Sequence, residues 1–187
     1  MPKPLHTGRL VLAPQDPRLL PAMPEFLAER FESIGFIHGK LPGEPVRYRL
    51  GESFMALVTF MGCSPALRLE PGGGNEPFCY ASFQGPYEQP RLLVGKNTTP
   101  PRCAACGSRI GDWRALLERS TPLPCPHCGR PLEPLTLNWR HSAGAGRLFL
   151  YVENIFPQEA LPSPELMRHL QEASAGHAWN HFYIQEA

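Results

Sequence analysis

Residues 103–129 read CAACGSRIGDWRALLERSTPLPCPHCG, and this stretch opens and closes with the same pattern, Cys-x-x-Cys-Gly. The two copies are Cys103–Gly107 and Cys125–Gly129, and eighteen residues, 107–124, separate the inner cysteines. Two residues between cysteines form a tight turn that directs both sulfurs at one ion, and the following glycine can adopt a positive φ that brings backbone N–H groups near the sulfurs. Paired turns with a spacing of about 15 to 20 residues are typical of metal sites. The stretch therefore predicts that the middle of the chain folds around a metal ion.

Zinc is the metal that this ligand set favours. Four thiolates at about 2.3 Å complete a tetrahedron around Zn²⁺ and leave no position for an activated water, so we expect a structural and not a catalytic ion. Iron in a rubredoxin-like site and unbound or redox-active thiols are the alternatives. His127, inside the second turn, is expected to be an exposed spacer, because four thiolates are available without it. The expected ligands are Cys103, Cys106, Cys125 and Cys128.

The paired turns resemble the knuckles of zinc ribbons and rubredoxin-like modules. The resemblance covers residues 102–132 and implies a metal site, but no particular activity, because such modules occur in transcription factors, ribosomal proteins, RNA-modification proteins and many enzymes. One departure is visible between the turns. Residues 112–119 (DWRALLER) predict a short helix capped by Asp112, where a simple ribbon has a β-hairpin.

Proline-rich sequence flanks the cysteine segment on both sides. Residues 98–103 read TTPPRC, and residues 129–134 read GRPLEP. Such flanks are typical of module boundaries. We therefore expect residues 100–132 to form an inserted zinc-ribbon-like module, and residues 1–99 and 133–187 together to form one α+β domain.

The sequence outside the module alternates short apolar runs with turn-forming residues, which predicts strands. Two amphipathic helices are expected as well: Pro24 suits the first turn of one and Gly35 its C-terminal end, whereas Ser163 suits the N-cap of the other and Gly176 its end. Together these elements predict an α+β fold with a mainly antiparallel sheet. The expected strands are residues 46–50, 53–60, 65–70, 78–83, 92–95, 135–139, 147–156 and 178–184.

The overall composition limits the class of protein. The chain has 187 residues, of which 42% are apolar and 19% charged, and its formal net charge is +1. This composition excludes a highly charged disordered chain and a globally basic nucleic-acid binder. The longest apolar run, residues 54–63, has about half of the roughly 20 residues needed to cross a bilayer, so we expect no membrane contact.

The N-terminal residues 1–15 contain no apolar core of secretory type, so we expect a cytoplasmic protein whose cysteines bind metal or stay reduced. Lysine occurs three times, at Lys3, Lys40 and Lys96, whereas Arg, Ala, Gly and Pro are abundant. This bias indicates a bacterial protein from a GC-rich genome.

Three classes of function remain open. The preferred one is a binding, scaffold or regulatory protein with a protein partner. The second is a nucleic-acid-binding accessory protein, because residues 100–150 carry seven arginines against three acids, with Trp113 and Trp139 close by. The third is an enzyme that uses Cys63, at the end of an apolar run, as nucleophile.

Each residue behind the second and third classes has a structural alternative that we favour. Cys63 and Cys79 are expected to be buried thiols, because cysteine is among the most buried residue types. Trp113 is expected to lie on the buried face of its short helix with Leu116 and Leu117, where it anchors the module instead of stacking on a base.

Overall fold

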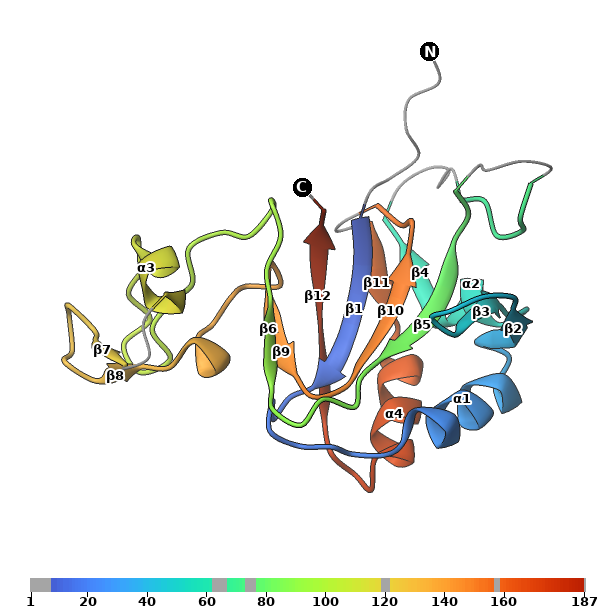
Figure 1. Cartoon of the computed structure of the whole chain (residues 1–187), viewed down its shortest axis with the longest axis horizontal. Coiled ribbons are helices and arrows are strands. Elements are labelled where there is room, and N and C mark those ends of the chain that lie inside the picture. Colours follow the sequence, from blue (N-terminus) through green and yellow to red (C-terminus); the bar gives the residue numbers. More distant parts are fainter. Residues whose placement is uncertain (1–7, 62–66, 73–76, 119–121, 157–158, 187) are drawn as a thin grey trace, which may run out of the picture.

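The structure is a computed structural model that describes residues 8–61, 67–72, 77–118, 122–156 and 159–186. Its centre is a six-stranded sheet with the order β12-β1-β10-β5-β3-β2, in which every pair of neighbours is antiparallel (Figure 1). The predicted α+β fold with a mainly antiparallel sheet is thereby confirmed. The strands of this sheet are β1 (Gly8–Pro14), β2 (Ile37–Leu41), β3 (Arg47–Leu50), β5 (Tyr80–Gln84), β10 (Phe149–Glu153) and β12 (Trp179–Gln185).

Strand β1 lies inside the sheet and is buried on both faces. Leu10 and Leu12 belong to one apolar cluster and Val11 and Ala13 to another, and all four side chains are 0% exposed. A strand that is buried on both faces has a continuous apolar sequence without alternation. For this reason β1 is missing from the strands that the sequence predicts, although residues 10–13 are all apolar.

Two helices cover one face of the sheet, namely α1 (Pro24–Ser33) and α4 (Pro164–Ala173) (Figure 1). Both agree with the predicted amphipathic helices. The Ser163 hydroxyl caps α4 by accepting the N–H of Leu166 at 3.1 Å. Gly35, just after α1, has a φ of +71°, as expected of a residue that ends a helix. Phe31 and Leu170, both 0% exposed, bring the apolar faces of the two helices into the same core.

The prediction of one strand over residues 53–60 is wrong. These residues form the helical turn α2 (Phe54–Leu57) and the short strand β4 (Val58–Phe60). Phe54 and Leu57, three residues apart, are both buried, which is helical spacing. A short continuous apolar run carries no period that distinguishes the two conformations.

Strand β4 pairs with β11 (Ala160–Pro162) outside the main sheet. The predicted strand at residues 65–70 is not observed over residues 67–70, whereas residues 65 and 66 lie outside the described part of the chain. There the carbonyl of Arg68 accepts the N–H of Cys79 at 2.7 Å.

The predicted strand at residues 135–139 is also wrong. A single 3₁₀ turn, η1 (Pro134–Thr136), begins at a proline and is closed by the N–H of Thr136, which donates to the carbonyl of Glu133 at 3.0 Å. Asn138 then makes one isolated bridge with Arg102, through backbone bonds of 2.8 and 3.0 Å. The segment that leads into the cysteine region and the segment that leaves it therefore lie side by side.

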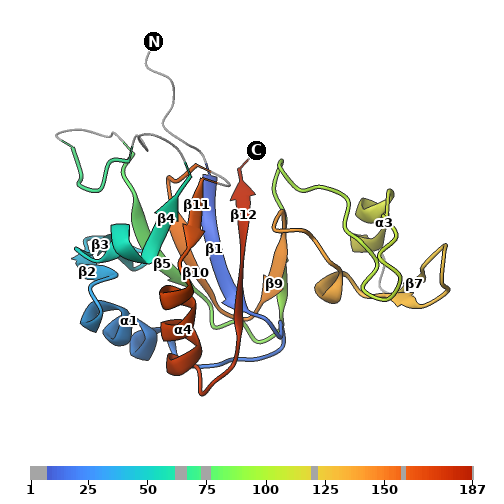
Figure 2. The same cartoon turned by 180° about the vertical axis from the view of Figure 1, so that it is seen from behind.

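Residues 142–146 contain the strand β9 (Gly144–Gly146), which pairs with β6 (Arg91–Leu93). The small residues serve packing here: a Cβ on Gly144 would lie 2.3 Å from the ring of Phe182. The cysteine region extends to one side of the main sheet, beyond β6 and β9, in both views (Figures 1 and 2). Within the described residues, no helix has the length and apolar character needed to cross a membrane.

Candidate functional site

The two cysteine turns have the same backbone geometry. In the first turn, the N–H of Cys103 donates to the carbonyl of Ser108 at 2.9 Å, and the N–H of Gly107 donates to the carbonyl of Cys103 at 2.9 Å. The equivalent bonds of the second turn are 2.7 and 2.9 Å long. The short strands β7 (Leu123–Pro124) and β8 (Pro131–Leu132) pair around the second turn. Each turn is therefore a closed knuckle that holds its cysteines at fixed places.

The four sulfurs form a compact cluster. The Sγ atoms of Cys103 and Cys128 are 3.8 Å apart, as are those of Cys106 and Cys125, and all four lie within 4.8 Å of one another. Four sulfurs at about 2.3 Å from a central zinc ion would be separated by about 3.8 Å along each edge of the tetrahedron. A disulfide needs about 2.05 Å, so these cysteines are not bridged. The donor set and its spacing fit a metal ion.

Hydrogen bonds to the sulfurs prepare the cluster for a cation. The Ser108 hydroxyl lies 3.0 Å from Sγ of Cys106 and 3.5 Å from Sγ of Cys125, and it lowers the pKa of both thiols. With further bonds from the N–H groups of Cys128 and His127, the pKa of Cys125 falls to about 6. These bonds favour the thiolate, which is the form that binds metal.

The pKa of the Cys128 thiol is shifted in the opposite direction. The N–H of Arg130 lowers the pKa of Cys128, but desolvation and the sulfurs of Cys106, Cys125 and Cys103 outweigh it and raise the pKa to about 11. Four adjacent thiols cannot all ionise without a compensating positive charge. A divalent cation would supply that charge.

The glycine after each knuckle adopts a left-handed conformation, with φ of 72° at Gly107 and 73° at Gly129. Both positions have space for a Cβ, so the backbone conformation alone requires glycine. We expect Gly129→Ala to destabilise the metal-loaded protein by about 1 kcal/mol, measured by urea unfolding. Gly111→Ala is the matched control, because Gly111 is open and not left-handed; its stability should be unchanged or slightly higher. If both variants changed the free energy of unfolding equally, the left-handed conformation would not be the reason for glycine at position 129.

A small apolar cluster supports the knuckles. Trp113, the first residue of α3 (Trp113–Leu117), packs edge-to-face on Trp139 with ring centroids 5.3 Å apart. Trp113 is 3% and Trp139 4% exposed, which confirms the predicted anchor. The short helix is confirmed too, but Asp112 makes no capping bond and Leu117 is 39% exposed, against expectation.

The cluster reaches beyond the second knuckle. Leu137, Trp139 and Ala143 share it with Cys103 and Cys125. We therefore call residues 102–143 the metal segment.

No family model, curated protein or solved structure matches the chain. The knuckle-like metal site accordingly rests on its cysteine geometry alone.

Among the described residues of 100–150, the two tryptophans present no exposed ring face to a base. Both indole rings are buried, and the guanidinium of Arg114 lies 4.3 Å from the centre of the Trp113 ring. Arg102 donates to the carbonyl of Gly107 at 2.9 Å. Arg119 lies outside the described residues.

The two remaining cysteines have different outcomes. Cys63 lies outside the described residues, so its suggested roles stay predictions. Cys79 is 1% exposed, as expected of a core thiol, and its Sγ donates to the carbonyl of Asn154 at 3.0 Å. Burial raises the pKa of Cys79 to about 11, which keeps it protonated and unreactive near neutral pH.

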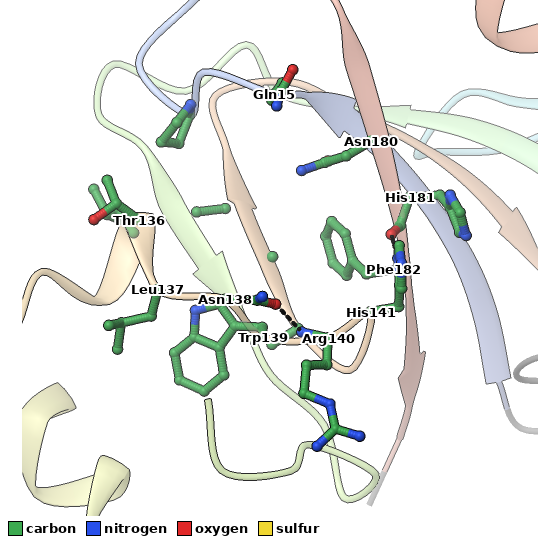
Figure 3. A pocket seen from close by; sticks show the side chains of 15 residues that line it. Gln15, Thr136, Leu137, Asn138, Trp139, Arg140, His141, Asn180, His181 and Phe182 are labelled. Carbon is green, nitrogen blue, oxygen red and sulfur yellow. Dashed lines mark hydrogen bonds between the residues drawn. The ribbon is translucent and has the colours of Figure 1, made fainter. Parts of the chain in front are cut away.

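A cavity of about 410 Å³ lies where the metal segment meets the main sheet (Figure 3). No sequence pattern indicated it, because its residues come from distant parts of the chain. It is lined by Gln15 and Pro17 after β1, by residues 135–141 and 143–145 of the metal segment and β9, and by residues 180–182 of β12.

A left-handed turn forms the rim of this cavity. The N–H of Ser142 donates to the carbonyl of Trp139 at 3.0 Å and closes a four-residue turn. Its central residues, Arg140 and His141, have φ of 51° and 61°. Two consecutive left-handed residues are the pattern of a type I′ turn, in which Asn and Gly are usual.

His141 of this turn stacks on His181 of β12. The rings of His141 and His181 are 4.4 Å apart and 18° from parallel. Nδ1 of His141 lies 2.6 Å from the carbonyl oxygen of His181, and because a carbonyl can only accept, Nδ1 carries the proton. Burial, and then the neighbouring His141, lower the pKa of His181 to about 4. His181 is therefore neutral at pH 7.

The low pKa of His181 makes stability depend on pH. In the unfolded chain His181 has a pKa near 6.5, so between pH 6.5 and 4 it is protonated there but neutral in the folded protein. Its contribution to the free energy of unfolding is therefore fully present above about pH 6.5 and is lost as the pH falls from 6.5 to 4. Allowing for partial exposure, we expect this group to remove about 1 kcal/mol between pH 7.5 and 5.5. Urea unfolding of His181→Gln should show a smaller loss than the wild type, whereas the exposed control His177→Gln should match it. An identical pH dependence in His181→Gln would contradict the assignment.

Proposed function

We propose that this protein binds one zinc ion at its four knuckle cysteines and that the ion is structural. The observation that supports this proposal most strongly is the pair of 3.8 Å separations between sulfurs of opposite knuckles, which equals the edge of a zinc tetrathiolate tetrahedron. Four thiolates fill the coordination shell, so no water can be activated at the metal. The proposed ligands are Cys103, Cys106, Cys125 and Cys128.

The ion would hold together a segment that has little core of its own. The apolar cluster of the metal segment contains nine buried residues, and two of them are metal-binding cysteines. Clusters of this size depend on a metal or disulfides for their folding. With the ion bound, the metal segment supplies one wall of the cavity beside β12.

This arrangement supports a binding role, with the protein acting as a scaffold or regulatory component. The metal segment projects from the sheet and presents exposed side chains, whereas the apolar side chains of its internal cluster are buried. We propose a protein partner for this surface, and a reducing cytoplasm as the compartment in which five described cysteines stay as thiols or thiolates.

Elemental analysis of the purified protein tests the metal assignment. We expect one zinc per chain and no colour; a red protein with visible absorption would indicate iron in the same site. Cys125→Ser should lose most of the zinc, because it removes one ligand. Cys79→Ser is the matched control and should keep it, since Cys79 lies in the core of the sheet. Unchanged zinc in Cys125→Ser, or none in the wild type, would refute the proposal.

A further inference from the structure

The polar groups that line the cavity are uncharged or positive. Among its fifteen described lining residues, none carries a carboxylate. Gln15, Asn138 and Asn180 contribute carboxamides, and Arg140 contributes the permanent positive charge. In Figure 3, Asn180 reaches into the cavity from β12, whereas Arg140 lies at the rim. The lining therefore favours a ligand with negative charge and several hydrogen-bonding atoms.

Internal bonds leave donors facing the cavity. Oδ1 of Asn138 accepts the backbone N–H of Arg140 at 3.0 Å, which fixes the orientation of the carboxamide. Its amide nitrogen, with two N–H donors, remains for a ligand. Arg140 lines the edge of the cavity, and a guanidinium is suited to grip an oxyanion through paired N–H donors.

The strained turn at the rim is held in place by buried hydroxyls. Ser142, 6% exposed, donates through Oγ to the carbonyl of Trp139 at 2.8 Å and accepts the N–H of Thr99 at 3.0 Å. The Thr98 hydroxyl donates to the carbonyl of Ser142 at 2.9 Å. The surroundings thus enforce a left-handed conformation that Arg140 disfavours, and strain maintained in this way is characteristic of binding sites.

From these features we infer that the cavity binds a small organic anion, with its oxyanion group at Arg140 and Asn138 and a polar, hydroxyl-bearing body toward Gln15 and Asn180. The cavity volume of about 410 Å³ is that of a small-molecule site. Carboxamides both donate and accept, which matches hydroxyl groups. This inference rests on the proposed function, because the zinc centre holds the wall that carries Arg140.

Titration of the zinc-loaded, ¹⁵N-labelled full chain tests the inference. The probes are inorganic phosphate, ribose 5-phosphate, ribonate and neutral ribose. We expect saturable shifts of the backbone amides of residues 138–142 and 180–182 with the anions, tighter binding of a sugar-bearing anion than of inorganic phosphate, and no saturation with ribose. Comparison of ribose 5-phosphate with ribonate distinguishes a phosphate ligand from a carboxylate ligand.

Arg140→Gln should weaken anion binding about tenfold, because it removes the charged donor while a non-glycine residue stays in the turn. Arg109→Gln is the matched control: Arg109 is an exposed arginine of the metal segment outside the cavity, and its loss should leave anion binding unchanged. The zinc content of each sample is measured in parallel, so a failure of the metal assignment is recognised separately.

Three outcomes would overturn the inference in protein that contains its zinc. They are the absence of saturable shifts with every anion, equal weakening by both arginine variants, and binding of ribose as tight as that of ribose 5-phosphate. Binding of a single-stranded oligoribonucleotide at the same amides, not displaced by the small anions, would assign the cavity to nucleic acid instead.

Discussion

Removal of the metal by a chelator is expected to unfold the metal segment and to leave the six-stranded sheet folded. Structural zinc contributes about 10 to 16 kcal/mol of apparent folding free energy in small tetrahedral sites, far more than a cluster of nine buried residues can replace. Among the described residues, the sheet has its own core of twenty-four buried residues, none of them a knuckle cysteine. The unfolding caused by loss of the ion should therefore be confined to the metal segment.

Hydrogen exchange measures this effect residue by residue. The amides of Cys103, Gly107 and Cys125, which make the knuckle bonds, should lose protection in the chelated protein, whereas those of Leu10 and Val152 in the sheet should keep it. Added zinc should restore the lost protection. Loss of protection throughout the sheet would show instead that the metal segment is integral to the main core.

The second large effect is expected from Trp113→Ala. The indole is 3% exposed and packs on Trp139, so its removal leaves a cavity in a very small cluster. We expect the metal segment to lose about 3 to 5 kcal/mol of stability, with weaker retention of zinc against a competing chelator. Urea unfolding, followed by the fluorescence of the remaining tryptophans Trp139 and Trp179, gives the stability.

Leu117→Ala is the control for this variant, because Leu117 lies on the same helix but is 39% exposed. Its effect should stay within about 0.5 kcal/mol. A Trp113→Ala protein of unchanged stability that loses salt-sensitive binding to single-stranded RNA would instead make Trp113 a platform for bases.

Local sequence determines the features that were predictable. Each knuckle lies within six residues, and its cysteines and glycine specify the turn directly, so the expected ligand set meets in space. Helix α4 was predictable for the same reason, since Ser163 and the proline after it mark its start.

Features that depend on distant contacts were not predictable. Strand β1 is buried on both faces by residues that are distant in the sequence, and β9 lies where Gly144 fits against the ring of Phe182. The cavity joins Gln15, residues 135–145 and residues 180–182, which no local pattern connects. Its turn uses Arg140 and His141 at positions where sequence rules expect Asn and Gly.

The central claim is that four cysteine sulfurs surround a structural zinc ion. X-ray absorption at the zinc edge of the purified protein tests it most directly, because it reports the number, type and distance of the ligand atoms. A tetrathiolate centre predicts four sulfur atoms at about 2.3 Å and no lighter ligand. A nitrogen or oxygen ligand at about 2.0 to 2.1 Å in place of a sulfur, as from His127 or a bound water, would contradict the closed structural site.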